Sequence, residues 1–339
     1  MSALSQAMPL HLANTGTGDL RLCCPQCGTQ VCIVREDSEV APLRTNCPHC
    51  GLPIALQDGI WRTMHPTESA RLAGTVSAYE TVRTAEGRWS ADSGFYLALP
   101  WHDTTSRFAA QWQIRGSSFS FLQAKILPVL QKRLGKSSLR ILDLGAGNCW
   151  MSYRLALAGH RPLAIDLCTN AQDGLGAARH YENALGRLFP RFEASMDRLP
   201  FADAQFDLAI YNASFHYSQD YAATVREALR VLVPSGFILI VDSPTYPTEA
   251  DGEAMLREKS AEFMRRFGTD SGNMGGLEFL TPERLAKLEV LGIRWQRFSP
   301  WYGIRWALRP MIAKLRGRRR PSAFFIYLGT PALQREASR

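Results

Sequence analysis

The sequence ILDLGAGNCW, from Ile141 to Trp150, predicts a buried strand that runs through a glycine turn into a helix. Turns of this kind are typical of sites for nucleotide-like cofactors. A dinucleotide site also needs a third glycine three residues after the second, where this chain has Trp150. Asp143 would also set a negative charge beside the phosphates. The stretch therefore argues against a diphosphate ligand and favours one with a positive group, which an acid stabilises at hydrogen-bond distance.

Apolar runs on either side of this turn alternate with helical patterns. The runs are LRILDL, PLAIDL, FDLAIYN and GFILIVD, and the helical segment YAATVREALRVLV precedes the last of them. Such alternation predicts a doubly wound α/β fold with a mostly parallel, Rossmann-like sheet covered on both faces. A helix that starts with TPER at Thr281 and the strand-like runs IRWQRFS and SAFFIYLG complete the pattern. Ligands of such sheets bind beyond the carboxyl ends of the strands, where the glycine turn lies.

The residues from Leu139 to Asp242 resemble class I S-adenosylmethionine-dependent methyltransferases of the type 11 group. The resemblance implies a methyltransferase sheet and S-adenosylmethionine as the cofactor, whose positive groups suit an acid in the turn. Asp143, Gly145 and Gly147 match the first motif of the family, with Cys149 where a third glycine is usual. By the resemblance, Asp143 and the backbone of the turn hold the methionine end.

The second and third family motifs predict the contacts of the nucleoside. Asp166 ends the second strand, 19 residues beyond Gly147, and its carboxylate can accept hydrogen bonds from both ribose hydroxyls. The segment SMDRLPFADAQFD resembles the adenine-binding turn of the family. Ser195 stands where relatives usually have an acid, and the nearest acid is Asp197. We expect Ser195 to make the polar contact with adenine and Met196 to stack on the base.

Methyl transfer from a sulfonium is an in-line displacement, so the protein must orient a nucleophile and shield the site. Polar side chains follow the fourth and fifth strands at Asn212, His216, Tyr217, Asp242 and Tyr246. We predict His216, Tyr217 and Asn212 as the catalytic residues. The unperturbed pKa of His216 suits proton removal near neutral pH, and a packing role in the loop is the alternative.

Two short repeats, CPQCG and CPHCG, contain four of the eight cysteines. Each repeat sets two thiolates two residues apart, and 19 residues separate Cys27 from Cys47. The spacing predicts one closed tetrahedral zinc site held by Cys24, Cys27, Cys47 and Cys50. Because four ligands leave no open position, the metal is expected to fold a small ribbon and to take no part in the chemistry. The ribbon is similar to that of ribosomal-RNA guanine methyltransferases.

The remaining cysteines have other interpretations. Cys23 could replace Cys24 as a ligand, but only Cys24 repeats the spacing of the second pair. Cys32, Cys149 and Cys168 are interpreted as small apolar residues.

The chain is expected to divide into five regions. They are a flexible tail (1–20), a zinc ribbon (21–60), a helical, aromatic-rich cap or linker (61–135), the methyltransferase domain (136–330) and a second tail (331–339). Core packing accounts for most of the aromatic side chains in the cap. The stretch FYLALPWHD, residues 95–103, is the part expected to form a wall of a substrate pocket.

The positive charge is concentrated in one segment. The formal net charge is +8, and residues 292–320 hold nine Lys or Arg without an Asp or Glu, which leaves −1 for the rest. If the sixth strand runs parallel to the others, this segment overhangs the substrate entrance. Its cations and apolar residues suit a nucleic-acid backbone or an anionic membrane surface, and a solvated helix edge is the alternative.

Composition predicts a globular protein. The chain is 46% apolar, shows no run of about 18 apolar residues and begins without the features of a signal peptide. We therefore expect a cytoplasmic location and no transmembrane segment. The pattern as a whole predicts an S-adenosylmethionine-dependent methyltransferase acting on an O, N or C nucleophile of a small molecule, a lipid-like molecule or RNA. The alternative is a catalytically silent cofactor-binding scaffold that recruits a protein partner through its ribbon.

Overall fold

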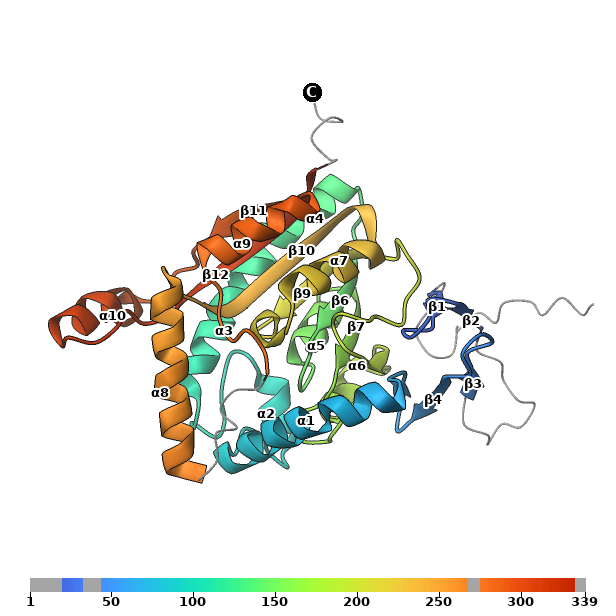
Figure 1. The fold of residues 1–339 in the computed structure, drawn as a ribbon, viewed down its shortest axis with the longest axis horizontal. Helices are drawn as coiled ribbons and strands as arrows, with labels where there is room; N and C mark the ends of the chain where they lie inside the picture. Colours follow the sequence, from blue (N-terminus) through green and yellow to red (C-terminus); the bar gives the residue numbers. More distant parts are fainter. Residues whose placement is uncertain (1–19, 33–43, 268–274, 333–339) are drawn as a thin grey trace, which may run out of the picture.

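The computed structural model describes residues 20–32, 44–267 and 275–332. The tails expected at 1–20 and 331–339 lie almost wholly outside these ranges, and so do residues 33–43 of the expected ribbon. The described part is built on a large, mostly parallel sheet with helices on both faces (Figure 1). The predicted α/β fold class is thereby confirmed.

The large sheet has 10 strands in the order β11-β12-β10-β9-β6-β7-β8-β5-β4-β3. Those of the methyltransferase region are β6 (Arg140–Leu144), β7 (Arg161–Asp166), β8 (Arg191–Glu193), β9 (Phe206–Asn212), β10 (Leu232–Thr245), β11 (Ile293–Phe298) and β12 (Ala323–Pro331). Strand β12 is antiparallel to both of its neighbours, so β11 runs parallel to β10. The strand order reverses at β6, and the glycine turn that follows β6 lies at this switch point.

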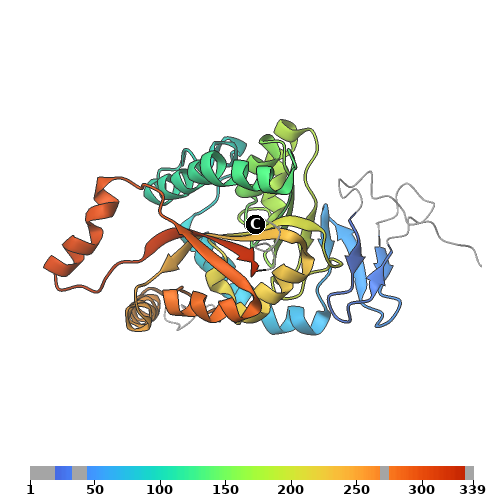
Figure 2. The same ribbon diagram turned by 90° about the horizontal axis from the view of Figure 1, so that it is seen from above.

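Side chains along the buried strands alternate between two apolar clusters, because successive residues of a strand point to opposite faces. On β6, Leu142 and Leu144 face one cluster and Ile141 faces the other. The first cluster is covered by α7 (Tyr221–Val231) and α9 (Pro282–Lys287). The second is covered by α3 (Ala109–Phe121), α4 (Leu127–Leu134) and α5 (Trp150–Leu157). Figure 2 shows these two helical layers on opposite sides of the sheet.

The ribbon strands continue the large sheet beyond β8. They are β3 (Arg44–Asn46), β4 (Pro53–Gln57) and β5 (Ile60–Arg62), and β5 pairs in parallel with β8. The hairpin of β1 (Leu22–Cys23) and β2 (Gln30–Val31) lies beside them. Trp61 therefore belongs to a buried strand, and the helical region begins later than Trp61, at Pro66.

The remaining helices connect these layers. They are α1 (Pro66–Glu86), α2 (Ser93–Ala98), the π-helix η1 (Leu122–Ile126), the 3-10 segments η2 (Leu175–Tyr181), η3 (Phe215–Tyr217) and η4 (Leu288–Leu291), α6 (Glu182–Leu185), α8 (Glu249–Phe267) and α10 (Ile304–Leu315). The ribbon and α10 lie at opposite ends of the molecule (Figures 1 and 2). Of the helices in the described ranges, none is both long and apolar enough to cross a membrane.

Candidate functional site

A cleft of about 990 Å³, including its open mouth, lies between α1 and the carboxyl ends of the parallel strands. The predicted site residues that line the cleft are Gly145, Gly147, Asp166, Ser195, Met196 and Tyr217. Asp143, Asn212 and His216 are not in its lining.

The glycine turn needs its glycines for conformation and for space. Gly145 has φ +73°, and a Cβ there would lie 2.4 Å from the Cβ of Ser214. Gly147 has φ +51°, and its amide donates to Asp166. Cys149, in the position of the usual third glycine, also adopts the left-handed region at φ 62°. The turn therefore keeps the backbone path expected for a glycine at this position although the residue has a side chain.

Trp150 is the first residue of α5 and is buried. Its indole packs edge-on against Trp112 and Phe119 of α3, with ring centroids 5.9 and 5.8 Å away. The bulky side chain thus contributes to the contact between α3 and α5. The third glycine of a dinucleotide site would provide no side chain for this contact.

Asp166 ends β7 with its carboxylate at the cleft. One oxygen accepts from the amide of Gly147 and the other from the amide of Cys168, each at 2.8 Å. Burial raises the pKa of Asp166, and these two backbone donors act in the opposite direction. Because each carboxylate oxygen has two lone pairs, both retain capacity for one more donor.

Asp143 lies behind the turn and is fully buried. Its Oδ2 accepts from the hydroxyl of Ser152 at 2.6 Å, whereas Oδ1 has no partner among the described residues. Burial raises the pKa of Asp143 to about 7. The side chain is therefore poised between its neutral and charged forms near neutral pH, and a nearby positive charge would favour the charged form.

The segment that follows β8 forms a further wall of the cleft. Ser195, Met196 and Asp197 all line it, and the Ser195 hydroxyl donates to the Asp197 carboxylate. The acid of this turn thus sits beside Ser195 although it comes two residues later in the sequence. Ser195 and Asp197 therefore form a hydrogen-bonded pair that borders the cleft.

The carboxyl ends of β9 and β10 bring together two polar side chains. Asn212 pairs in register with Val241, the residue before Asp242. Asn212 Oδ1 and Asp242 Oδ2 are buried and have no partner within the described ranges. The other oxygen of Asp242 accepts from the Ser118 hydroxyl at 2.5 Å, and burial raises the pKa of Asp242 to about 6.

His216 and Tyr217 share the short η3 segment but have different surroundings. His216 is buried, and its Nδ1 lies 3.3 Å from the Ser243 hydroxyl. Burial, aided by the positive charges of Lys259 and Arg115, lowers the pKa of His216 to about 3. Tyr217 lines the cleft and packs edge-on against Tyr79 of α1, with ring centroids 5.9 Å apart.

Helix α1 forms one wall of the cleft. From the sequence, residues 95–103 were expected to form such a wall. The α1 residues in the lining are Arg71, Leu72, Thr75, Val76 and Tyr79, whereas none of 95–103 lines the cleft. Arg83 of α1 pairs with Asp173, and Glu80 accepts from Asn170 at 2.7 Å. The expectation for FYLALPWHD stays a prediction, since none of its residues lines this cleft and Phe95, Tyr96 and Leu99 are buried in the second apolar cluster.

Residues 142–240 match the type 11 methyltransferase domain family. These residues form a methyltransferase domain. The malonyl-[acyl-carrier protein] O-methyltransferase of Erwinia pyrifoliae is 34% identical over 129 residues, which are 38% of this chain and 44% of that protein. The demethylmenaquinone methyltransferase of Thermus thermophilus is 30% identical over 151 residues, 43% of this chain and 66% of that protein. The chain thus spans no more than two thirds of the length of these two relatives.

Solved structures that match this chain include the 1,6-didemethyltoxoflavin-N1-methyltransferase of Burkholderia thailandensis, whose crystal structure has bound 1,6-didemethyltoxoflavin and S-adenosylhomocysteine. It is 15% identical, with a TM-score of 0.44, and the match covers 88% of this chain and 98% of that one.

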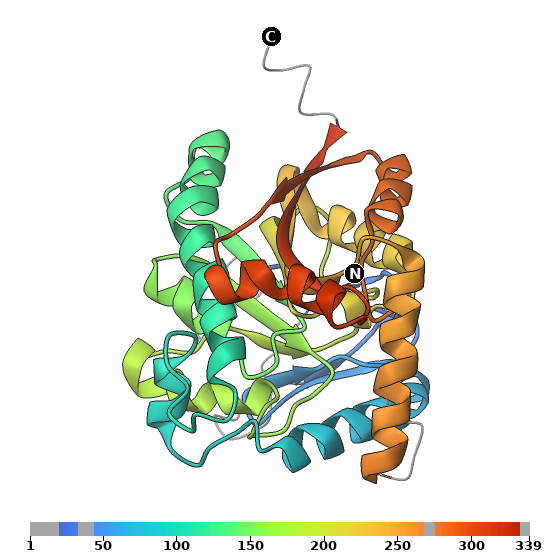
Figure 3. The same cartoon turned by 90° about the vertical axis from the view of Figure 1, so that its left-hand side faces the viewer.

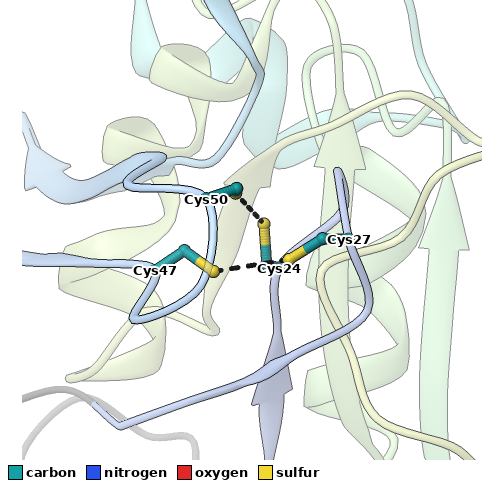
Figure 4. Close-up of side chains that lie close together, drawn as sticks. All are labelled: Cys24, Cys27, Cys47 and Cys50. Atoms are coloured by element: carbon teal, nitrogen blue, oxygen red, sulfur yellow. Dashed lines mark hydrogen bonds between the residues drawn. The ribbon is translucent and has the colours of Figure 1, made fainter.

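The four cysteines of the two repeats converge in front of the methyltransferase domain (Figure 4). Their sulfur atoms all lie within 4.8 Å of one another, and two pairs, Cys24 with Cys50 and Cys27 with Cys47, are 3.5 Å apart. Tetrahedral coordination at a Zn–S distance of about 2.3 Å separates sulfurs by roughly 3.8 Å. The cluster therefore has the size and the donor set of a closed four-thiolate site.

The two repeats adopt the same turn. The amide of Gly28 donates to the carbonyl of Cys24 at 2.8 Å, and the amide of Gly51 donates to that of Cys47 at 2.9 Å. Cys23 lies outside the cluster, where its thiol donates to the carbonyl of Phe201. Among the other cysteines, Cys149 and Cys168 are buried as expected, whereas Cys32 is exposed.

The ribbon packs directly on the methyltransferase domain. Arg62 and Thr63, at the end of β5, contact Glu193 through an ion pair at 3.3 Å and a hydrogen bond at 2.7 Å. The amide of Cys23 donates to the carbonyl of Pro200 at 3.1 Å. These contacts flank Ser195, so the ribbon supports the part of the chain expected to bind adenine.

Proposed function

We propose that this chain is an S-adenosylmethionine-dependent methyltransferase that binds its cofactor between the glycine turn and α1. The observation that carries the proposal is the Asp166 carboxylate at the cleft, oriented by the amides of Gly147 and Cys168. Two backbone donors fix the plane of this carboxylate, and its free lone pairs match the two neighbouring hydroxyls of a ribose. Ser195 and Asp197 face the same cleft and suit the adenine amine.

Two buried oxygens support a cofactor with a positive end. Asp143 and Asn212 each have one that lacks a donor among the described residues, and both lie in the carboxyl-terminal halves of their strands. An ammonium group offers three donors and a charge opposite to that of the Asp143 carboxylate. A pyrophosphate would offer only acceptors and a like charge. The residues present therefore fit S-adenosylmethionine better than a dinucleotide.

When bound, S-adenosylmethionine supplies a methyl group activated by a sulfonium. Helix α1 covers the cleft and keeps water from the reacting atoms, and Tyr217 and Tyr79 hold the acceptor at its wall. Asp242 is the group that we assign to proton acceptance, because a carboxyl with a pKa of about 6 is mostly ionised at neutral pH. His216, with a pKa of about 3, is better suited to packing η3.

The acceptor that we propose is a small or lipid-like molecule with an O, N or C nucleophile. Leu72, Val76 and Tyr79 give the cleft an apolar wall that suits such a molecule. The named relatives act on different acceptors, among them a carrier-protein acyl group and demethylmenaquinone, so the family alone selects none. We propose that the four-cysteine cluster holds a structural zinc ion, because it has four thiolates and no open position.

A labelling experiment tests this function. The full-length protein is incubated with S-adenosylmethionine bearing a deuterated methyl group and with small-molecule, lipid and RNA extracts. Mass spectrometry then identifies products that gain the label. We expect labelled small or lipid-like products that disappear with Asp166→Ala. Labelled RNA would overturn the acceptor class, and tight cofactor binding without any labelled product would favour the silent scaffold.

A further inference from the structure

Helix α10 and the turns around it form a projection between β11 and β12 (Figures 1 and 3). Because β11 runs parallel to β10, the projection leaves the sheet at the edge where the cofactor cleft lies. We propose that this projection, residues 300–320, is an interfacial element that docks the protein on an anionic lipid bilayer. The proposal concerns a surface separate from the cofactor cleft and does not depend on which acceptor is methylated.

The outer face of α10 is an uncovered apolar stripe. At 100° per residue, its five members fall within an arc of about 100° on the helix. They are Ile304, Leu308, Met311, Ile312 and Leu315. All five are exposed, and the exposed fractions of Leu315 and Ile304 reach 79% and 68%. A helix that serves only as a solvated edge would place charges on this face, so the stripe indicates a partner that covers it.

The inner face of α10 is anchored to the domain. Trp306 stacks on Phe324 of β12 with ring centroids 5.3 Å apart, and it contacts Tyr302 edge-on at 5.4 Å. The Tyr302 hydroxyl in turn lies 2.9 Å from that of Ser118, which donates to Asp242. The orientation of the helix is thus fixed by its inner face, and this orientation is what turns the apolar stripe outward.

The cations lie on both sides of the stripe. On the helical wheel, Arg305 and Arg316 flank it on one side and Lys314 on the other. Arg318 and Arg320 follow the helix without an acid in the sequence from 292 to 320. This is the arrangement of a helix that lies in a bilayer surface, with its apolar face about 5–10 Å deep and its cations near the lipid phosphates. Exposed Trp301, at the start of the projection, belongs to the residue type enriched at such interfaces.

Two cations of the basic segment pair with acidic side chains of the protein itself. Arg294 pairs with Glu289 at 3.1 Å, and Arg319 pairs with Glu258 of α8 at 2.7 Å. Arg319 also lies over the Tyr246 ring. Neutralising Arg319 would therefore disturb the anchoring of the projection, and the cations suited to a binding test are Arg316, Arg318 and Arg320.

Charge and shape together favour a bilayer over RNA. A nucleic-acid backbone would satisfy the cations but would leave five aliphatic side chains in water, because they offer neither hydrogen bonds nor stacking surfaces. An anionic bilayer satisfies both features at once. A second copy of this chain would bring the same excess of cations to the contact, which opposes association.

The test is sedimentation of the full-length protein with vesicles of phosphatidylcholine alone or with 30% phosphatidylglycerol. One variant carries Ile304→Gln, Leu308→Gln and Leu315→Gln, and another carries Arg316→Gln, Arg318→Gln and Arg320→Gln. The matched control carries Leu157→Gln and Val290→Gln, two exposed apolar residues outside the projection. Emission of Trp301 reports insertion, with Trp301→Phe to identify its share of the signal.

We expect binding to the anionic vesicles, a blue shift that Trp301→Phe removes, and control binding equal to wild type. The aliphatic variant should lose at least tenfold in affinity at both low and high salt. The arginine variant should lose about fivefold for each cation removed, the equivalent of about 1 kcal/mol per cation.

Three results would overturn the proposal. The first is an absence of vesicle binding by the wild type. The second is tight RNA binding that the arginine variant loses and the aliphatic variant keeps, together with weak vesicle binding. The third is a dimer in solution that the aliphatic variant dissociates, since the stripe would then be a contact between copies. Circular dichroism spectra that match wild type establish that the variants remain folded.

Discussion

Asp143→Asn is expected to stabilise the protein above pH 7 and to weaken cofactor binding. The carboxyl of Asp143 is buried, and its pKa is raised from 3.8 to about 7. The folded protein therefore holds a proton there that the unfolded chain releases above pH 3.8. The stability that this neutral carboxyl provides is complete below pH 3.8, falls as the pH rises, and is lost above about pH 7. Asparagine is neutral throughout, so the variant escapes this loss.

The magnitude follows from the size of the pKa shift. Roughly three pKa units, at about 1.4 kcal/mol each, set an upper limit of about 4 kcal/mol for the gain at pH 8. An amide that cannot satisfy all its hydrogen bonds in the buried site reduces this gain by about 1–3 kcal/mol. We expect a net gain on the order of 1–3 kcal/mol at pH 8 that shrinks steadily toward pH 4.

Urea unfolding between pH 4 and pH 8 measures this difference in free energy of unfolding. Asp203→Asn, at a side chain that is 77% exposed, is the matched control and should leave the pH profile nearly unchanged. Calorimetry on the same samples should show weaker S-adenosylmethionine binding by Asp143→Asn, since the ammonium loses its negative partner. A variant less stable than wild type by the same amount at every pH, with unchanged cofactor affinity, would refute the reasoning.

Three further outcomes follow from the site. Cys24→Ser should release the metal, measured by elemental analysis, and should weaken cofactor binding because β5 supports the adenine segment, whereas Cys32→Ser should do neither. Gly145→Ala should destabilise the fold by about 2–4 kcal/mol through clash and left-handed strain, against about 1 kcal/mol for Gly135→Ala, where the added methyl meets open space. Asp242→Asn should lower kcat and remove a limb near pH 6 from its pH profile; an unchanged profile would exclude proton acceptance by Asp242.

The strands that the sequence identifies best are the fully buried ones. β6, β9 and the apolar part of β10 consist mostly of apolar residues, because helices cover both of their faces. β8 has only three residues and gives no such run. The pairing of β5 with β8 is also missing from any local pattern, since it joins residues 131 positions apart. The pairing of short strands that lie far apart in the sequence therefore cannot be predicted from local sequence patterns.

The site shows the same division between local and distant information. The spacing of Gly145, Gly147 and Asp166 in the sequence is enough to predict them as site residues. A single turn and the end of a single strand place all three at the cleft. The acidic neighbour of Ser195 was visible as Asp197, but the hydrogen bond between them depends on the fold of the loop. The lowered pKa of His216 and the raised pKa of Asp242 arise from burial within the folded domain, so residue type alone does not predict either shift.

The sequence gives only a weak indication that α1 forms a wall of the cleft. Leu72, Val76 and Tyr79 recur at helical spacing, but a single apolar side of a helix does not reveal whether it faces a core or a ligand. The ribbon also contacts the segment expected to bind adenine, because Arg62 and Thr63 at the end of β5 bond to Glu193, and no local pattern predicts this contact. Both features arise from contacts between the first 90 residues and the domain that follows.

The most direct test of the central claim is calorimetric titration of the full-length protein with S-adenosylmethionine, compared with NAD. The account predicts binding of S-adenosylmethionine, none of NAD, and a loss of about 1.5–3 kcal/mol with Asp166→Ala, the value of a hydrogen bond to a charged group. Asp203→Ala is the exposed control and should bind like wild type. Tight NAD binding, or S-adenosylmethionine binding that Asp166→Ala leaves unchanged, would contradict the assignment of this cleft.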